Sequence, residues 1–107
     1  MKIEVIKPSK MILDGVTAQP FRQEVMKLLD KNPKPDVILA DLQNVTFMDS
    51  AGLGTLVSIL KTVRVAGSQF YVCSLSEQVK VIFELTKMEK VFQIFKDPPD
   101  FEAKHQN

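Results

Sequence analysis

Residues 37–40 form a short, unbroken apolar run between Asp36 and Asp41. A strand that is covered on both faces has such a sequence, because neither row of its side chains meets water. Parallel sheets with helices on their faces provide this environment. The run therefore predicts the central strand of an α/β domain.

Amphipathic helices are expected on both sides of this strand. The earlier helix follows Thr17 as its N-cap and has apolar residues at i, i+4, i+7 and i+8, namely Phe21, Val25, Leu28 and Leu29. It should stop at the prolines of residues 32–35. The later helix begins near Ser50, has apolar residues at helical spacing from Leu53 to Val63, and should end at Gly67 in the left-handed conformation.

The remaining segments are shorter. Residues 3–6 and 11–13 are compatible with two strands around a proline-containing turn. Residues 70–73 predict another strand, and residues 74–77 have the form of a capping box before a helix carrying Val79, Ile82, Phe83 and Thr86. Residues 91–95 could be a last strand. The tail from 97 to 107 is polar and expected to fray, unless Phe101 tethers a short helix.

Size and composition narrow the functional classes. A chain of 107 residues can build one core, and 45% hydrophobic with 25% charged residues is typical of a globular protein. The 14 basic and 13 acidic residues are scattered, so a nucleic-acid-binding stripe is not expected. Charge-free stretches fall well short of the roughly 20 residues that span a bilayer, which favours a cytoplasmic protein without membrane contact. The single cysteine, Cys73, excludes an internal disulfide and predicts a buried apolar residue.

Few residues could carry catalysis. His105 is the only histidine and lies near the end of the chain, so a general base or metal ligand in a rigid site is not expected. Gly52 and Gly54 lack the third glycine of a dinucleotide-binding loop and the Gly-Lys-Ser/Thr of a P-loop, so they are interpreted as turn formers. Three aspartates, Asp14, Asp41 and Asp49, could converge at one end of the sheet, but turn formation and capping are the favoured roles. No enzyme, metal or cofactor is predicted.

Ser50 is the residue that permits a sharper hypothesis. It follows Asp49 at the start of the later helix, where serine is most often a cap or first-turn residue. From spacing alone, that structural role is favoured. A phosphate would nevertheless be compatible with this position, because unpaired N–H groups and the positive end of the helix dipole meet it there.

Residues 42–54 carry the string Asp-Ser-x-Gly-Leu-Gly after an apolar strand and at the opening of a helix. This pattern resembles the signature of the STAS domain of bacterial anti-sigma-factor antagonists, and the similarity extends over most of the chain from about Leu13. The resemblance implies one STAS domain over residues 1–107. It also implies a mixed sheet of four or five strands with helices mainly on one face, in which the two N-terminal strands form the antiparallel part.

The resemblance further implies a function. The unmodified protein would bind a partner that is both anti-sigma factor and serine kinase, and so regulate sigma-dependent transcription. That partner would phosphorylate Ser50 and so end binding, and a serine phosphatase would restore it. The docking surface would comprise the exposed side of the helix and residues Asp14, Asp49, Ser50, Ala51, Gly52, Leu53 and Gly54. The protein would be a monomer or weak homodimer.

Two alternatives stay open. The chain could be a free-standing STAS subunit of a transport or signalling complex without a phosphorylation switch, since serine is also a good cap. A nucleotide-hydrolysing enzyme, suggested only by the aspartates and the two glycines, ranks third.

Overall fold

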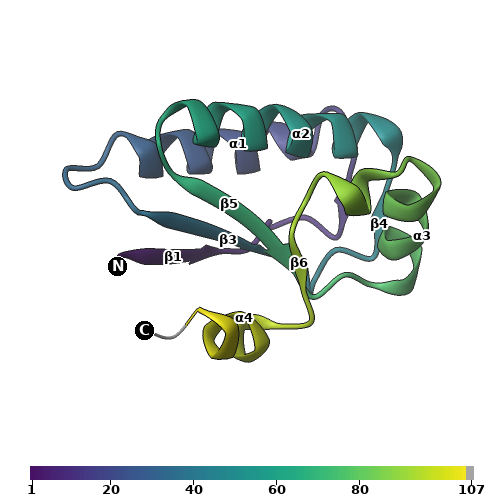
Figure 1. Ribbon diagram of the computed structural model, residues 1–107. Coiled ribbons are helices and arrows are strands. Elements are labelled where there is room, and N and C mark those ends of the chain that lie inside the picture. The colour runs from purple at the N-terminus through teal and green to yellow at the C-terminus, as the bar shows by residue number, and fades with distance from the viewer. Residues whose placement is uncertain (106–107) are drawn as a thin grey trace.

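The computed structural model describes residues 1–105 as alternating strands and helices (Figure 1). The first half contains β1 (Ile3–Ile6), β2 (Ile12–Leu13), α1 (Ala18–Leu29), β3 (Val37–Asp41) and β4 (Phe47–Met48). The second half contains α2 (Ser50–Val65), β5 (Gln69–Cys73), α3 (Glu77–Leu85), the 3-10 helix η1 (Met88–Lys90), β6 (Ile94–Phe95) and α4 (Pro98–Lys104). This order confirms the predicted α/β class.

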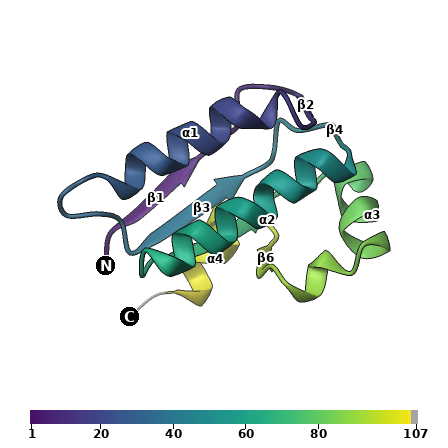
Figure 2. The ribbon, with the colours of Figure 1, turned by 90° about the horizontal axis from the view of Figure 1, so that it is seen from above.

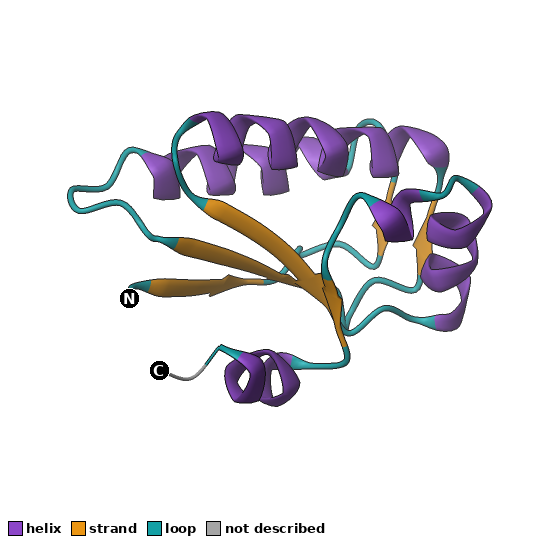
Figure 3. Cartoon of the chain, viewed as in Figure 1, coloured by secondary structure: helices purple, strands orange, loops and turns teal. Residues whose placement is uncertain are grey.

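The strands form two separate sheets, seen as the orange arrows of Figure 3. The main sheet has four parallel strands in the order β1-β3-β5-β6. The other is a parallel ribbon of β2 and β4, in which Ile12 is paired with Phe47 and Leu13 with Met48. We call this second sheet the β2–β4 ribbon; it lies at the end of the domain where α2 begins (Figure 2).

The prediction that the two N-terminal strands form an antiparallel part of the sheet is wrong. β1 pairs with β3 and not with β2, and both the β1–β3 and β2–β4 ladders are parallel. The reason lies in the connection, because the chain between β1 and β3 passes through β2 and α1 before it returns alongside β1. Such a crossover makes neighbouring strands parallel.

The central strand is buried on both faces, as its apolar run predicted. Every residue of β3 is buried. Ile38 and Ala40 belong to the larger core beneath α1 and α2, whereas Val37 and Leu39 belong to a second cluster on the opposite face. Helices α1 and α2 lie side by side over one face, and α4 lies against the other (Figures 1 and 2). Most of the helical cover is therefore on one face, as expected.

The C-terminal segment is more ordered than the sequence suggested. Residues 98–104 form α4, and the fully buried Phe101 ring lies 5.5 Å from Tyr71 and 5.1 Å from Phe95 between ring centroids. The predicted fraying is therefore wrong for this helix, and the alternative of a tethering Phe101 is correct. His105 is half-buried and stacks on Phe101 at 4.1 Å, so it is not a solvated tail residue. Residues 106–107, the rest of the predicted tail, lie outside the described residues.

Smaller corrections concern capping and the last strand. Ser76, and not Ser74, is the N-cap of α3, and its hydroxyl accepts a hydrogen bond from the Val79 N–H at 3.4 Å. The last strand is only Ile94–Phe95, and residues 91–92 form a turn and bend after η1. Cys73 is buried as predicted, and this burial raises the pKa of its thiol. Gly67 ends the α2 region with a φ of 86°.

Within residues 1–105, no helix combines the length and apolarity needed to cross a membrane.

Candidate functional site

The predicted switch residue, Ser50, is the first residue of α2 and is exposed. The helix is capped by the preceding residue, because Asp49 is extended and its Oδ1 accepts a hydrogen bond from the Gly52 N–H at 2.8 Å. The Leu53 N–H donates to the Asp49 carbonyl at 3.0 Å. Asp49 therefore supplies the capping role that a helix start requires, which leaves the Ser50 hydroxyl without that task.

The two glycines of the motif have different roles, and neither makes a turn. Both lie inside α2, and Gly52 is buried against the backbone of β2. A Cβ at Gly52 would lie 2.2 Å from the Leu13 carbonyl oxygen, whereas one at Gly54 would meet nothing within 4 Å. The predicted turn-forming role is thus wrong. Gly52 permits a close approach of α2 to β2. Nearby, the Asp49 N–H donates a hydrogen bond to the Leu13 carbonyl at 3.2 Å.

Asp14 organises the loop between β2 and α1. Its Oδ1 accepts hydrogen bonds from the N–H groups of Val16 and Thr17, both at 2.8 Å. In return, the Thr17 hydroxyl accepts from the Asp14 N–H at 2.8 Å and donates to the Ile12 carbonyl at 2.7 Å. The backbone N–H of Thr17, followed by that of Val16, holds the pKa of Asp14 below its ordinary value. Thr17 thus closes this loop, and its side chain caps no α1 N–H.

The structure brings together most, but not all, of the predicted site residues. Asp14, Asp49, Ser50 and Ala51 surround the start of α2, and a Cβ built on Gly15 would lie 3.3 Å from that of Ala51. Gly54 is exposed one turn further along the helix. Gly52 and Leu53 are buried, so they support this end of the helix, and their predicted part in a docking surface stays a prediction.

The third aspartate lies elsewhere. Asp41 ends β3 in the main sheet, where its buried carboxylate has one oxygen 3.8 Å from Lys7 Nζ and the other accepting from the Gln43 N–H at 3.1 Å. The possible convergence with Asp14 and Asp49 is therefore not found. Across the described residues, no group of three His, Cys, Asp or Glu side chains is arranged to hold a metal ion.

The β2–β4 ribbon adds residues that the sequence analysis missed. Its inner side chains, Leu13 and Met48, are fully buried, but its outer pair is exposed, with Ile12 at 51% and Phe47 at 45%. The neighbouring Met11 and Val16 are 62% and 80% exposed. We call these four residues, Met11, Ile12, Val16 and Phe47, the apolar patch. No sequence pattern predicted the apolar patch, because a two-residue strand does not reveal which side chain faces the core.

A side-chain amide fixes the ribbon to α3. Gln78 Oε1 accepts a hydrogen bond from the Met48 N–H at 2.8 Å, and its Nε2 donates to the Met48 carbonyl at 3.1 Å. The exposed face of the ribbon therefore belongs to a backbone that is held from both sides, by the β2 ladder and by Gln78.

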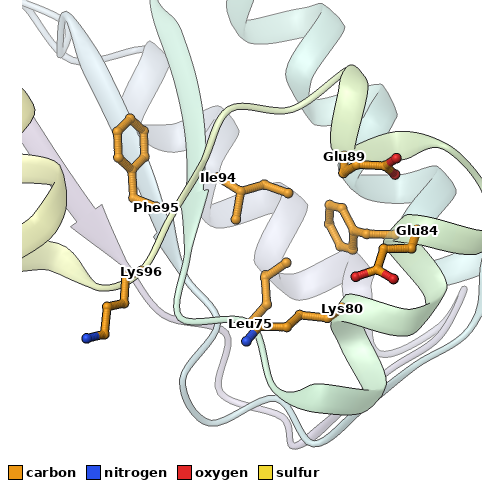
Figure 4. A pocket seen from close by; sticks show the side chains of 8 residues that line it. Leu75, Lys80, Glu84, Glu89, Ile94, Phe95 and Lys96 are labelled. Atoms are coloured by element: carbon orange, nitrogen blue, oxygen red, sulfur yellow. The ribbon is translucent and has the colours of Figure 1, made fainter.

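A pocket of about 330 Å³ lies between α3, η1 and β6 (Figure 4). Its apolar lining is Leu75, Phe83, Ile94 and Phe95, and its charged lining is Lys80, Lys96, Glu84 and Glu89. None of these is a predicted site residue. The pocket combines apolar walls with charges of both signs, and it gives no support to the nucleotide-hydrolysing alternative.

Comparison with known proteins identifies the family of this chain. The family model of the STAS domain matches residues 5–100. The chain belongs to the STAS domain family. This finding confirms the resemblance carried by residues 42–54.

Individual relatives agree with this assignment. The anti-sigma-B factor antagonist of Staphylococcus aureus is 28% identical over 75 residues, which cover 70% of this chain and 68% of that protein. Two solved structures share the fold. An anti-sigma factor antagonist from Mycobacterium paratuberculosis is 22% identical, with a TM-score of 0.82 over 99% of this chain and 87% of that one. The Bacillus cell fate determinant SpoIIAA in its phosphorylated form is 13% identical, with a TM-score of 0.67 over 97% and 92%. At these identities, the two structures show the fold alone.

Proposed function

We propose that this STAS protein is an anti-sigma-factor antagonist that is switched off by phosphorylation of Ser50. In this proposal, the unmodified protein binds a cytoplasmic anti-sigma factor that is also a serine kinase. The phosphorylated protein does not bind it, and a serine phosphatase reverses the change. The sequence relative named as an anti-sigma-B factor antagonist supports the general function.

The observation that carries the proposal is the position of Ser50. Its side chain is exposed at the first position of a 16-residue helix, and the adjacent Asp49 already caps that helix. A kinase could therefore modify the Ser50 hydroxyl without removing a hydrogen bond on which the fold depends. The N–H groups of the first turn and the helix dipole would accommodate the added phosphate, so the domain is expected to remain folded.

Phosphorylation would change the surface more than the structure. It adds roughly 1.5 to 2 negative charges at pH 7 to a position where the unmodified protein presents a small neutral hydroxyl. The phosphate would lie next to the half-buried Asp49, whose carboxyl group is at the same helix end. Binding of a partner to this surface is expected to weaken while the free protein keeps its fold.

The test is to incubate the protein with a purified anti-sigma factor kinase from the same organism and ATP, and to locate the phosphate by mass spectrometry. Ser50→Ala should abolish incorporation, whereas Ser9→Ala, which removes another exposed serine, should leave it unchanged. Phosphate on a serine other than Ser50, or none on the wild-type protein with every such kinase, would refute the proposal.

A pull-down from cell extract separates the proposal from the transport alternative. Recovery of an anti-sigma factor by the wild-type protein and by Ser50→Ala, but not by Ser50→Asp, would support the switch. Recovery of a membrane transporter subunit, with equal efficiency by all three forms, would favour the free-standing STAS subunit instead.

A further inference from the structure

The exposed apolar side chains of the patch lie in the two chain segments that adjoin the proposed switch. Ile12 and Phe47 are direct neighbours across the β2–β4 ladder and share its outer face. Phe47 is three residues before Ser50 in a segment whose backbone is fixed at Met48 and Asp49. Val16 follows Gly15, whose built Cβ lies 3.3 Å from that of Ala51, the residue after Ser50. Phe47 and Val16 therefore place two parts of the apolar patch in segments next to Ser50.

The two carboxylates near Ser50 accept hydrogen bonds from nearby backbone N–H groups. Asp14 Oδ1 accepts from the N–H groups of Val16 and Thr17, and Asp49 Oδ1 accepts from the N–H of Gly52. The apolar side chains of the patch are well exposed, from 45% at Phe47 to 80% at Val16.

We propose that the apolar patch of Met11, Ile12, Val16 and Phe47 is the main contact surface for the anti-sigma factor kinase, and that the phosphate on Ser50 prevents binding chiefly because it cannot be dehydrated there. This inference rests on the proposed function. The occupant follows from geometry, since a kinase that reaches the Ser50 hydroxyl must cover the residues on either side of it. The matching surface of the partner is apolar.

This arrangement explains how one modification could end binding. The unmodified interface removes apolar side chains from water, which is favourable and is not screened by salt as charge interactions are. A phosphate at its edge must lose its hydration without gaining new hydrogen-bond donors from an apolar partner, and that loss is strongly unfavourable. Charge repulsion alone would give a different signature, because salt screens it.

The first experiment measures binding of the anti-sigma factor that the wild-type protein recovers in the pull-down. The double variant Ile12→Thr/Phe47→Thr places a β-branched residue, which favours strands, at both positions and removes much of the ribbon's apolar surface. The control, Val65→Thr/Leu85→Gln, changes two exposed apolar residues at the far ends of α2 and α3. Isothermal titration should show at least about tenfold weaker binding for the ribbon variant and a change of less than about twofold for the control.

The second experiment compares unmodified and Ser50-phosphorylated protein at about 0.1 M and about 1 M salt, between which the Debye length falls from about 10 Å to about 3 Å. The fold-loss caused by phosphorylation should be the same at both concentrations within a factor of about three. Recovery of tight binding by the phosphorylated protein at high salt would overturn the dehydration mechanism.

The outcomes separate the two proposals. If phosphorylation ends binding but the ribbon variant, with unchanged circular dichroism and thermal midpoint, binds as tightly as wild type, the patch is not the contact surface and only this inference fails. If no anti-sigma factor binds the unmodified protein, the proposed function fails and this inference falls with it. If sedimentation shows a homodimer that the ribbon variant dissociates, the patch is covered by a second copy, which also overturns the assignment.

Discussion

Replacing Gly52 with alanine should destabilise the protein, although alanine is the better helix former. The added methyl would lie 2.2 Å from the Leu13 carbonyl oxygen and 2.7 Å from its carbon. Both are backbone atoms, so the start of α2 must move by roughly 1 Å to restore an ordinary contact. That movement also stretches the 3.2 Å hydrogen bond from the Asp49 N–H to the same carbonyl.

The expected magnitude follows from three contributions. Overpacking costs about 1–3 kcal/mol, and the weakened hydrogen bond costs about 0.5–1.5 kcal/mol. The gain in helix propensity offsets about 1 kcal/mol of this. The free energy of unfolding should therefore fall by about 2 kcal/mol, which lowers the Tm by roughly 8 °C for a domain of this size.

Gly54→Ala is the matched control, because the same substitution two residues later meets nothing within 4 Å. It should raise the free energy of unfolding by up to about 1 kcal/mol through helix propensity alone. Urea and thermal unfolding, followed by circular dichroism, measure both variants. If Gly52→Ala were as stable as Gly54→Ala, the close approach of α2 to β2 would not constrain this position and the reasoning would be refuted.

Two further predictions concern a carboxylate and the C-terminal helix. Hydrogen bonds lower the pKa of Asp14 below 3.8, so its carboxylate should stabilise the folded state above that pH. This stabilisation should be lost as the pH falls through the lower pKa of the folded protein. An NMR titration midpoint for Asp14 at or above 3.8 would contradict this prediction. Phe101→Ala should cost about 3–5 kcal/mol in urea unfolding, since the ring is fully buried against Tyr71 and Phe95. A loss below about 1 kcal/mol would mean that α4 is not docked on the sheet in solution.

The sequence was most informative where structure depends on local patterns. The apolar run of β3 predicted a strand covered on both faces, and its alternate residues do enter two clusters. The span of α2 was also predictable, because its apolar spacing and the left-handed Gly67 mark it. These features depend on periods of two or 3.6 residues, which a single sequence displays.

Strand pairing and surface apolarity could not be predicted in this way. Ile12 and Leu13 are adjacent apolar residues, but one is exposed and the other buried, and only the pairing with β4 decides which. Helix α4 is held in place by the contact of the Phe101 ring with Tyr71, which lies about 30 positions earlier in the chain. Such long-range contacts leave no periodic signal. The apolar patch therefore emerged only from the tertiary structure, and the sequence offered a helix tethered by Phe101 only as an alternative to fraying.

The Gln78 amide has a consequence for solubility. A two-stranded ribbon with an apolar outer face would normally offer its free backbone to another chain, and such edges are templates for aggregation. At Met48 the glutamine presents one acceptor and one donor, as the peptide group of a third strand would. This side-chain substitute for a strand blocks intermolecular β-pairing at that position. The ribbon can thus expose apolar side chains while the backbone N–H and C=O groups of Met48 stay paired. Those groups are then not available to start pairing with a strand of another molecule.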